Sequence, residues 1–241
     1  MSKSFPYLGE NQRVVFPPPA EADPEGLVAV GGNLSPGVLL SAYTQGIFPW
    51  YSRGEPILWW SPDPRFVLFP GELHVPKSLR RTLNKGRFSF TLDRAFPEVI
   101  GACSEVPRQG QHGTWITDDM IEGYNTLHEL GLAHSVEVWD GDVLAGGLYG
   151  VSLGSMFFGE SMFANASDAS KAGFVSFVEI LRSRGFDCID CQMYTDHLWR
   201  FGAREIGRSE FLAMLASALD RPTVRGNWGE RLCGTGRFSC S

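Results

Sequence analysis

The segment LYGVSLGSMFFGESMFANASDASK, residues 148–171, is the part of the chain around which the other segments can be arranged. Its pattern predicts a strand, a tight turn, a second strand and the start of a helix. It also places the carboxylate of Glu160 inside an otherwise apolar run. Burying an unpaired carboxylate costs several kcal/mol, so Glu160 is expected to be paired, protonated or used on a ligand. A structural ion pair at a strand edge would explain it equally well.

Gly159 stands in the middle of the second strand, directly before Glu160. A glycine inside a strand is typical of a β-bulge, where one extra residue re-aims the side chains around it. A bulge here would redirect Glu160. It would also put Phe157 and Met162 on one face despite their odd separation.

The composition of the chain excludes several classes of protein. With 241 residues, 43% of them hydrophobic and 20% charged, the chain can bury a full core. Its net charge of -6 argues against nonspecific coating of nucleic acid, although a local basic patch is compatible with it. No run reaches the ~18 to 20 apolar residues that span a bilayer, and the start has no apolar signal core. We therefore expect a cytoplasmic protein without a membrane partner.

Five cysteines without a secretion signal are typical of reduced thiols. Cys188 and Cys191 form a CxxC motif in FDCIDCQMY, residues 186–194, which is predicted to be a buried strand. Side chains alternate along a strand, so these two thiols point to opposite faces and cannot hold one metal ion. No metal site is expected. The same alternation places Asp190 and Gln192 on one face.

The segment HVPKSLRRTLNKGR, residues 74–87, is predicted to form a short helix with two unlike faces. At about 100° per residue, Lys77, Arg80 and Arg81 fall on one face, and Leu79 and Leu83 fall on the opposite one. A cationic face is often only a solvated face. On a net acidic protein it also suits the binding of phosphates.

Aromatic residues gather in GIFPWYSRGEPILWWSPDPR, residues 46–65, where four prolines interrupt any long helix or strand. This composition suits a rigid surface that stacks on flat ligands, and the core of a small domain is the alternative. Trp115, in GTWIT at residues 113–117, is expected outside the core, where stacking on a ligand is plausible. The tail after Pro222 is Gly-rich and basic, so we expect it to be loosely ordered.

The order of the remaining elements indicates a mixed α/β fold. Strands at residues 134–139 and 143–151 are joined by the hairpin dipeptide Asp140-Gly141 and lead into the opening segment. A helix ending at Gly185, the FDCIDCQMY strand, a short helix, another strand and a last helix at about residues 209–219 follow.

Several blocks, in order from about residue 16 to about residue 211, resemble the leucyl/phenylalanyl-tRNA protein transferase family. They are GLVAVGGNLS (26–35), AYTQGIFPW (42–50), ILWWSPDPR (57–65), GTWIT (113–117), LHELGLAHSVEVW (127–139), GGLYGV (146–151), FGESMF (158–163), and IDCQ with HLWRFGAREI (189–206). The resemblance implies a small N-terminal α/β domain, residues 1–63, and a catalytic domain, residues 64–222. The catalytic domain would have a GNAT-like fold, in which helices flank a mixed sheet as in the acyl-CoA N-acyltransferases. The tail, residues 223–241, would follow.

The resemblance also implies an activity. Such enzymes move Leu, Phe or Met from aminoacyl-tRNA onto the α-amino group of proteins that begin with Arg or Lys, which marks them for N-degron dependent degradation. An aminoacyl ester is already activated, so the reaction needs two positioned substrates and one proton transfer, and no cofactor or metal is expected. The expected partners are aminoacyl-tRNA and the acceptor protein, and we expect a monomer.

The resemblance assigns roles to individual residues. The catalytic pair would be Asp190 and Gln192, with Asp190 orienting the Gln192 amide, whose oxygen would accept a hydrogen bond from the attacking amine. Glu160 would receive either the basic N-terminal residue or the α-amine. The side chain of the transferred amino acid would enter a pocket formed by Leu148, Phe157, Met162 and Phe177. The 3′-adenosine of the tRNA would stack near Trp50, Trp115 and Tyr43. The tRNA phosphates would contact Lys77, Arg80 and Arg81.

Two segments depart from the family pattern. Asn33 stands where GGDLS is usual, and Trp199-Arg200-Phe201 replaces a run of smaller residues. Two other functions are alternatives to this one. An acyl-CoA transferase should carry a Gly-rich pyrophosphate loop after the bulged strand, where this chain has ANASDAS, residues 164–170. A noncatalytic tRNA-binding module would need the three cationic residues but not Asp190 or Gln192.

Overall fold

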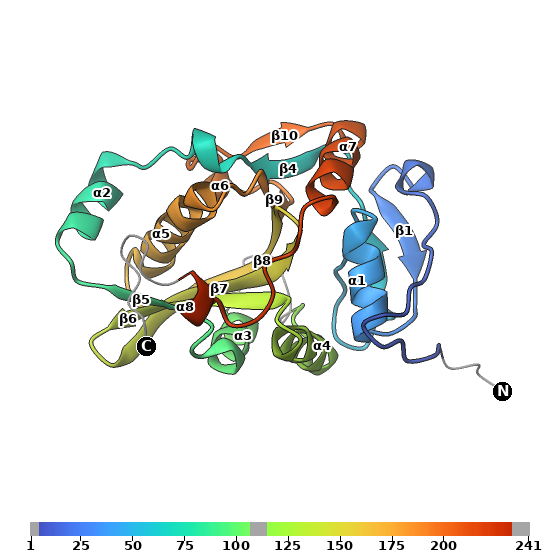
Figure 1. Ribbon diagram of the computed structural model, residues 1–241, viewed down its shortest axis with the longest axis horizontal. Coiled ribbons are helices and arrows are strands. Elements are labelled where there is room, and N and C mark those ends of the chain that lie inside the picture. Colours follow the sequence, from blue (N-terminus) through green and yellow to red (C-terminus); the bar gives the residue numbers. More distant parts are fainter. Residues whose placement is uncertain (1–4, 107–114, 233–241) are drawn as a thin grey trace.

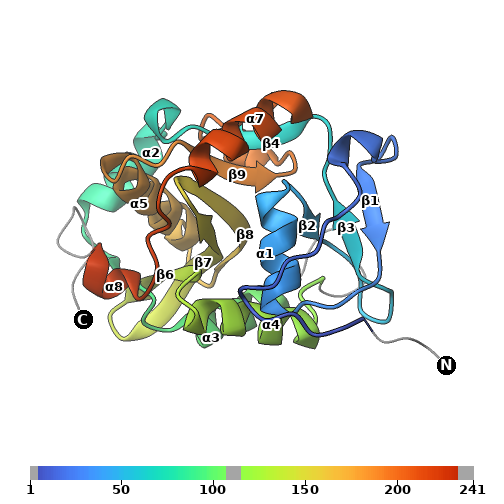
Figure 2. The same cartoon turned by 45° about the vertical axis from the view of Figure 1, so that its right-hand side comes forward.

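The computed structural model describes residues 5–106 and 115–232, and the chain within them forms two β-sheets. A small antiparallel sheet has the order β1-β3-β2, with β1 at Leu27–Val30, β2 at Phe48–Pro49 and β3 at Leu58–Trp60. The helix α1, Pro36–Thr44, begins with proline at its first position and lies between this sheet and the large sheet in both views (Figures 1 and 2).

The large sheet has seven strands in the order β10-β4-β9-β8-β7-β6-β5. Among the described residues, adjacent strands of this sheet pair antiparallel, except for β8 and β9, which run parallel to each other. The strands are β4 Arg65–Leu68, β5 Ser89–Leu92, β6 Ala133–Asp140, β7 Val143–Leu153, β8 Met156–Ala164, β9 Cys188–Gln192 and β10 Arg204–Ile206.

Helices cover both faces of the large sheet (Figure 1). On β7, a Cβ added at Gly146 would meet Ala169 of α5, and one added at Gly147 would meet Val99 of α3. Neighbouring residues of a strand point to opposite faces, so α5 and α3 pack on opposite sides. The helices are α2 Lys77–Asn84, α3 Phe96–Glu105, α4 Asp118–Glu129, α5 Ala169–Ser183, α6 Asp196–Trp199, α7 Arg208–Leu219 and α8 Trp228–Arg231, with short 3₁₀ turns at Pro19–Glu21 and Pro70–Glu72.

The predicted fold class is confirmed, because a small N-terminal region precedes a mixed sheet flanked by helices. The small sheet ends at Trp60 and the large sheet begins at Arg65. Buried apolar residues of both regions nevertheless belong to one core cluster, which includes Trp59 and Val67. The division into domains at residue 63 stays a prediction. No helix in the described part of the chain is long and apolar enough to cross a bilayer.

The segment after Pro222 differs from the expectation. Residues 223–232 are ordered and end in α8, whose first residue, Trp228, is fully buried. Burying an indole contributes several kcal/mol, and together with the buried Leu232 and the backbone hydrogen bond from Gly226 to Gly131 it helps to hold a segment that composition alone would leave loose. The expected loose tail is therefore wrong for residues 223–232, and residues 233–241 lie outside the described part.

Candidate active site

Glu160 is the extra residue of a β-bulge between β7 and β8. Tyr149 is opposite Ser161 and Gly150 is opposite Gly159, so Glu160 has no partner in the register. This confirms the bulge predicted from Gly159. The bulge bends the strand and turns Glu160 into the interior, where its side chain is 9% exposed.

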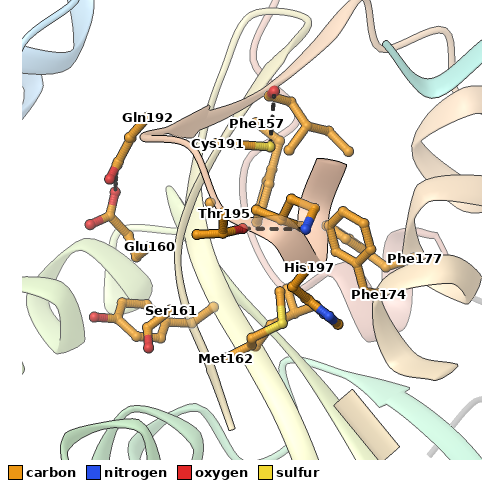
Figure 3. Close-up of a pocket in the computed structure, with 15 residues that line it drawn as sticks. Phe157, Glu160, Ser161, Met162, Phe174, Phe177, Cys191, Gln192, Thr195 and His197 are labelled. Carbon is orange, nitrogen blue, oxygen red and sulfur yellow. Dashed lines mark hydrogen bonds between the residues drawn. The ribbon is translucent and has the colours of Figure 1, made fainter. Parts of the chain in front are cut away.

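A cavity of about 270 Å³ opens where β8 and β9 separate (Figure 3). Their parallel pairing ends at Phe158 and Asp190, and the cavity follows between the two strands and α5. Glu160 and Gln192 are on its wall. The other lining residues are mostly apolar: Leu148, Tyr149, Phe157, Gly159, Ser161, Met162, Phe174, Phe177, Ile189, Cys191, Thr195, His197 and Leu198. All four residues predicted to form the side-chain pocket line this cavity.

Glu160 is surrounded by neutral hydrogen-bond donors. Tyr43 of α1 donates to Oε1 at 2.7 Å, Tyr124 of α4 donates to Oε2 at 3.0 Å, and Gln192 Nε2 donates to Oε1 at 2.8 Å. The two tyrosine hydroxyls also contact each other. Burial raises the pKa of Glu160 to about 7, and the Asp190 charge adds to this rise, whereas the hydrogen bonds lower the pKa. Glu160 can therefore gain or lose a proton near neutral pH.

Asp190 has a different kind of partner. Arg65 Nε donates to Oδ1 at 2.8 Å and Arg65 Nη2 donates to Oδ2 at 2.7 Å, a two-pronged ion pair buried on both sides. The guanidinium lies between the rings of Phe48 and Phe211, 4.7 Å and 4.5 Å from their centroids. Such a pair holds its members in place by both charge and geometry.

Gln192 connects the two carboxylates. Its backbone N–H donates to Asp190 Oδ1 at 2.9 Å, and its side-chain amide donates to Glu160. The residue adopts φ of 64°, a left-handed conformation that a residue with a Cβ reaches only at a cost. Asp190 was expected to orient the Gln192 amide. The structure corrects this expectation, because Asp190 binds the backbone of Gln192 and Glu160 binds its amide.

The chain is similar to known proteins over most of its length. The family model described as "Leucyl/phenylalanyl-tRNA protein transferase" matches residues 67–216, and the model of that family's N-terminal domain matches residues 32–63. A protein of this name from Anaeromyxobacter dehalogenans is 63% identical over 88% of this chain and 91% of its own length. The chain belongs to the leucyl/phenylalanyl-tRNA protein transferase family.

A second relative of the same name, from Myxococcus xanthus, is 58% identical over 92% of this chain and 95% of its own length. Among solved structures, L-PGS from Bacillus licheniformis superposes on 68% of this chain and 58% of its own, with a TM-score of 0.39 and 10% identity. That likeness is too low to support a function. Membership of the leucyl/phenylalanyl-tRNA protein transferase family makes the chain an aminoacyltransferase, as the resemblance predicted.

The residues expected to stack on adenosine are mostly inside the protein. Tyr43 is fully buried and binds Glu160, so its ring offers no face to a base. Trp115 is 8% exposed and belongs to the apolar core, which corrects its expected position outside the core; Gly113 and Thr114 beside it lie outside the described residues. Trp50 is half-buried, with its ring centroid 6.1 Å from that of Trp60. Of the three, Trp50 is the most accessible.

The predicted two-faced helix is confirmed in α2. Lys77, Arg80 and Arg81 are exposed, and Leu79 and Leu83 are buried, although the helix is shorter than predicted.

The predicted geometry of the CxxC motif, with its two thiols on opposite faces of the strand, is also confirmed. Cys188 is fully buried in the core cluster that includes α1, and Cys191 packs against the other cluster and lines the cavity.

Several residues around the cavity were missed by sequence reasoning. Arg65 carries the charge opposite Asp190, and Tyr124 completes the donors to Glu160. Thr195, the N-cap residue of α6, and His197 within α6 also line the cavity, and burial lowers the pKa of His197. A sequence signal existed only for Arg65, a charge at the start of the apolar segment RFVLF, residues 65–69.

Proposed function

We propose that this chain transfers Leu, Phe or Met from aminoacyl-tRNA to the α-amino group of proteins that begin with Arg or Lys. The product would carry a new N-terminal residue and would be marked for N-degron dependent degradation. The observation that carries this proposal is the apolar cavity with Glu160 and Gln192 on one wall. It offers a place for an apolar side chain directly beside a carboxylate that can take a proton and an amide that can accept a hydrogen bond.

The shape of the cavity supports the choice of amino acid. Phe157, Met162 and Phe177 contribute flexible or flat apolar surfaces, which suit Leu, Met and Phe side chains. The side chains of Leu, Met and Phe are unbranched at Cβ, so each is narrow near the backbone. A β-branched side chain would be wider at the entrance and is expected to fit less well.

The chemistry requires one proton to leave the attacking amine. The amine nitrogen forms a bond with the ester carbonyl carbon, and the bond from this carbon to the ribose oxygen breaks. An α-amino group has an ordinary pKa of about 7.7 to 8.0. Since the Glu160 pKa is about 7, transfer of a proton from the α-ammonium to Glu160 costs little at neutral pH. The nitrogen loses a second proton as the amide forms, and the departing ribose oxygen would take that proton, while Glu160 would release its own proton to water.

The surroundings of Glu160 favour the α-amine over a basic side chain as its partner. Three donors already occupy the carboxylate, and its side chain is 9% exposed, which leaves little access for a guanidinium. The amide nitrogen of Gln192 is engaged by Glu160. The amide oxygen is therefore the group of Gln192 that can accept a hydrogen bond from the attacking amine.

The tRNA body is expected to contact the cationic face of α2. Lys77, Arg80 and Arg81 are exposed on one side of this helix, where they can reach phosphates without reading bases. The start of α5 fits acyl-CoA poorly. Asp168 is the N-cap residue of this helix and pairs with Lys171 at 2.9 Å, so a carboxylate stands beside the helix start and would repel a pyrophosphate there.

A transfer assay tests the proposal directly. Labelled Leu or Phe on tRNA is mixed with a peptide that begins with Arg, and the same peptide with an acetylated N-terminus serves as the matched control. We expect label on the free peptide alone, and also on a peptide that begins with Lys but not on one that begins with Ala. Absence of label from the Arg peptide, with charged tRNA and folded protein, would reject the proposal.

A further inference from the structure

The aminoacyl cavity is supported from behind by the C-terminal segment. The indole of Trp228 has its centroid 6.1 Å from that of Phe157 and 6.1 Å from that of Phe177, two rings that line the cavity. Trp228 does not line the cavity itself and is fully buried. It therefore forms a second layer behind two of the rings that would hold the transferred side chain.

Trp228 is fixed on its other side by His134 and Asp93. The imidazole of His134 stacks on the indole with 3.8 Å between centroids. His134 Nδ1 lies 2.8 Å from Asp93 Oδ2, and the backbone N–H of Trp228 donates to the same oxygen at 2.7 Å. Burial lowers the pKa of His134, so the neutral ring donates through Nδ1 to the carboxylate.

The segment between α7 and α8, which leads to Trp228, is held by contacts along its length. After α7 it crosses to α8, which lies near β5 and β6 (Figures 1 and 2). Gly226 N–H donates to the Gly131 carbonyl at 3.1 Å, and Arg225 pairs with Glu10 at 3.0 Å. The Trp228 Nε1–H donates to the Val224 carbonyl at 2.9 Å. The indole thus has a defined position rather than a loose contact.

We propose that Trp228 is a positioning residue that sets the depth of the aminoacyl pocket through Phe157 and Phe177. The inference depends on the proposed function, because it takes the cavity to be the site of the transferred side chain. Protein interiors are close-packed, so the two rings cannot retreat while the indole stands behind them. A smaller residue at position 228 would let them retreat, and the pocket would deepen.

A deeper pocket should favour the larger of two substrates. Leu would lose contacts with the displaced rings, whereas Phe would still fill the space. A difference of one methylene in an apolar pocket changes discrimination by about 10-fold or more. We expect Trp228→Phe to raise the ratio of kcat/KM for Phe to that for Leu by about 10-fold.

Trp59→Phe is a matched control for this experiment. Trp59 is 1% exposed, and its Nε1–H also donates to a backbone carbonyl, that of Gly31, at 2.8 Å. Its ring packs against Phe16 in the other core cluster, and it does not line the cavity. The same substitution therefore removes a comparable indole and hydrogen bond without touching Phe157 or Phe177.

Both full-length variants are assayed with Leu-tRNA and Phe-tRNA, below the lower of their measured Tm values. A raised Phe/Leu ratio in Trp228→Phe, with the wild-type ratio in Trp59→Phe, is the expected result. Equal loss of Leu and Phe transfer in Trp228→Phe would make the indole merely structural and overturn the inference. If Trp228→Phe does not fold, Trp228→Tyr is compared by the same ratio. A wild-type chain that transfers neither amino acid would reject the proposed function as well.

Discussion

Asp190 and Glu160 are two buried carboxylates in one site, and they differ in the charge of their partners. Asp190 receives two hydrogen bonds from the Arg65 guanidinium, whereas Glu160 receives hydrogen bonds from hydroxyls and an amide. Neutral donors only partly replace water around a charge, and the pKa of Glu160 rises to about 7. Burial alone therefore does not decide whether a carboxylate serves structure or proton transfer.

Gln192 joins these two environments and shows why both are needed. Its backbone is tied to the ion-paired Asp190, and its side chain is tied to the titrating Glu160. The Arg65–Asp190 pair thus acts as a fixed support for the strained turn at Gln192. Glu160 supplies the group whose protonation can change during a reaction cycle.

Breaking the ion pair should have the largest effect. Arg65→Met leaves Asp190 buried without its counter-charge, which should lower the free energy of unfolding by about 3 to 5 kcal/mol. The double variant Arg65→Met with Asp190→Leu should recover only part of this loss, because the apolar pair needs no counter-charge but the Gln192 N–H loses its acceptor. Urea unfolding measures all of these variants.

The exposed pair of Arg53 and Asp118 provides the control for that experiment. The two side chains are 67% and 80% exposed, so Arg53→Ala should change stability by about 1 kcal/mol or less. If Arg65→Met were no more destabilising than Arg53→Ala, the supporting role of the buried pair would be wrong.

Replacing the titrating acid should lower the rate of transfer without disrupting the fold. Glu160→Gln keeps an oxygen for Tyr43 and the shape of the side chain, but it cannot accept a proton. We expect kcat for transfer to fall by about 10² to 10⁴, the usual contribution of a general base. Circular dichroism should show an unchanged fold, and wild-type kcat in this variant would remove Glu160 from the proton path.

The raised pKa of Glu160 also predicts how stability depends on pH. Its pKa is 4.5 as an ordinary group and about 7 in the folded chain, so between these values the folded chain holds a proton that the unfolded chain has lost. Stability from this group therefore falls as pH rises through that window, by about 3 kcal/mol in total. Above about pH 7 the whole of this loss of stability is present.

The comparison of wild type with Glu160→Gln isolates this contribution, since all other groups titrate alike in both. From pH 4.5 to pH 8, the free energy of unfolding of wild type should fall relative to that of the variant. A constant difference across this range would show that Glu160 titrates in the folded chain as it does in the unfolded one.

Removing one neutral donor should have the smallest effect. Tyr124→Phe deletes the hydrogen bond at 3.0 Å that favours the charged form of Glu160. The pKa of Glu160 should rise further, and the midpoint of the pH–rate profile should move to higher pH by about 1 unit. Tyr51→Phe, which removes a hydroxyl bonded to Thr117, serves as the control and should leave the midpoint unchanged. A midpoint that moved to lower pH would contradict the role of Tyr124 as a donor.

Local sequence patterns predicted the parts of the site that depend on neighbouring residues. Gly159 inside a strand indicated the bulge at Glu160, and the spacing of leucines and cations indicated both faces of α2. These features follow from the geometry of a single strand or helix, whose periods are independent of the rest of the chain. Composition misled where burial decided the outcome, as with Trp115 and with residues 223–232, which include Trp228.

By itself, the sequence determined the element order, the mixed α/β class and the bulged strand with Glu160, and its resemblance to the family implied four of the apolar residues of the cavity. Only the tertiary structure decided which carboxylate is ion-paired with Arg65 and that the pKa of Glu160 is raised to about 7. Arg65 and Asp190 are 125 residues apart in the chain, and Tyr43 and Glu160 are 117 apart. No local period relates such distant residues, and the protonation of a buried acid depends on every group packed around it.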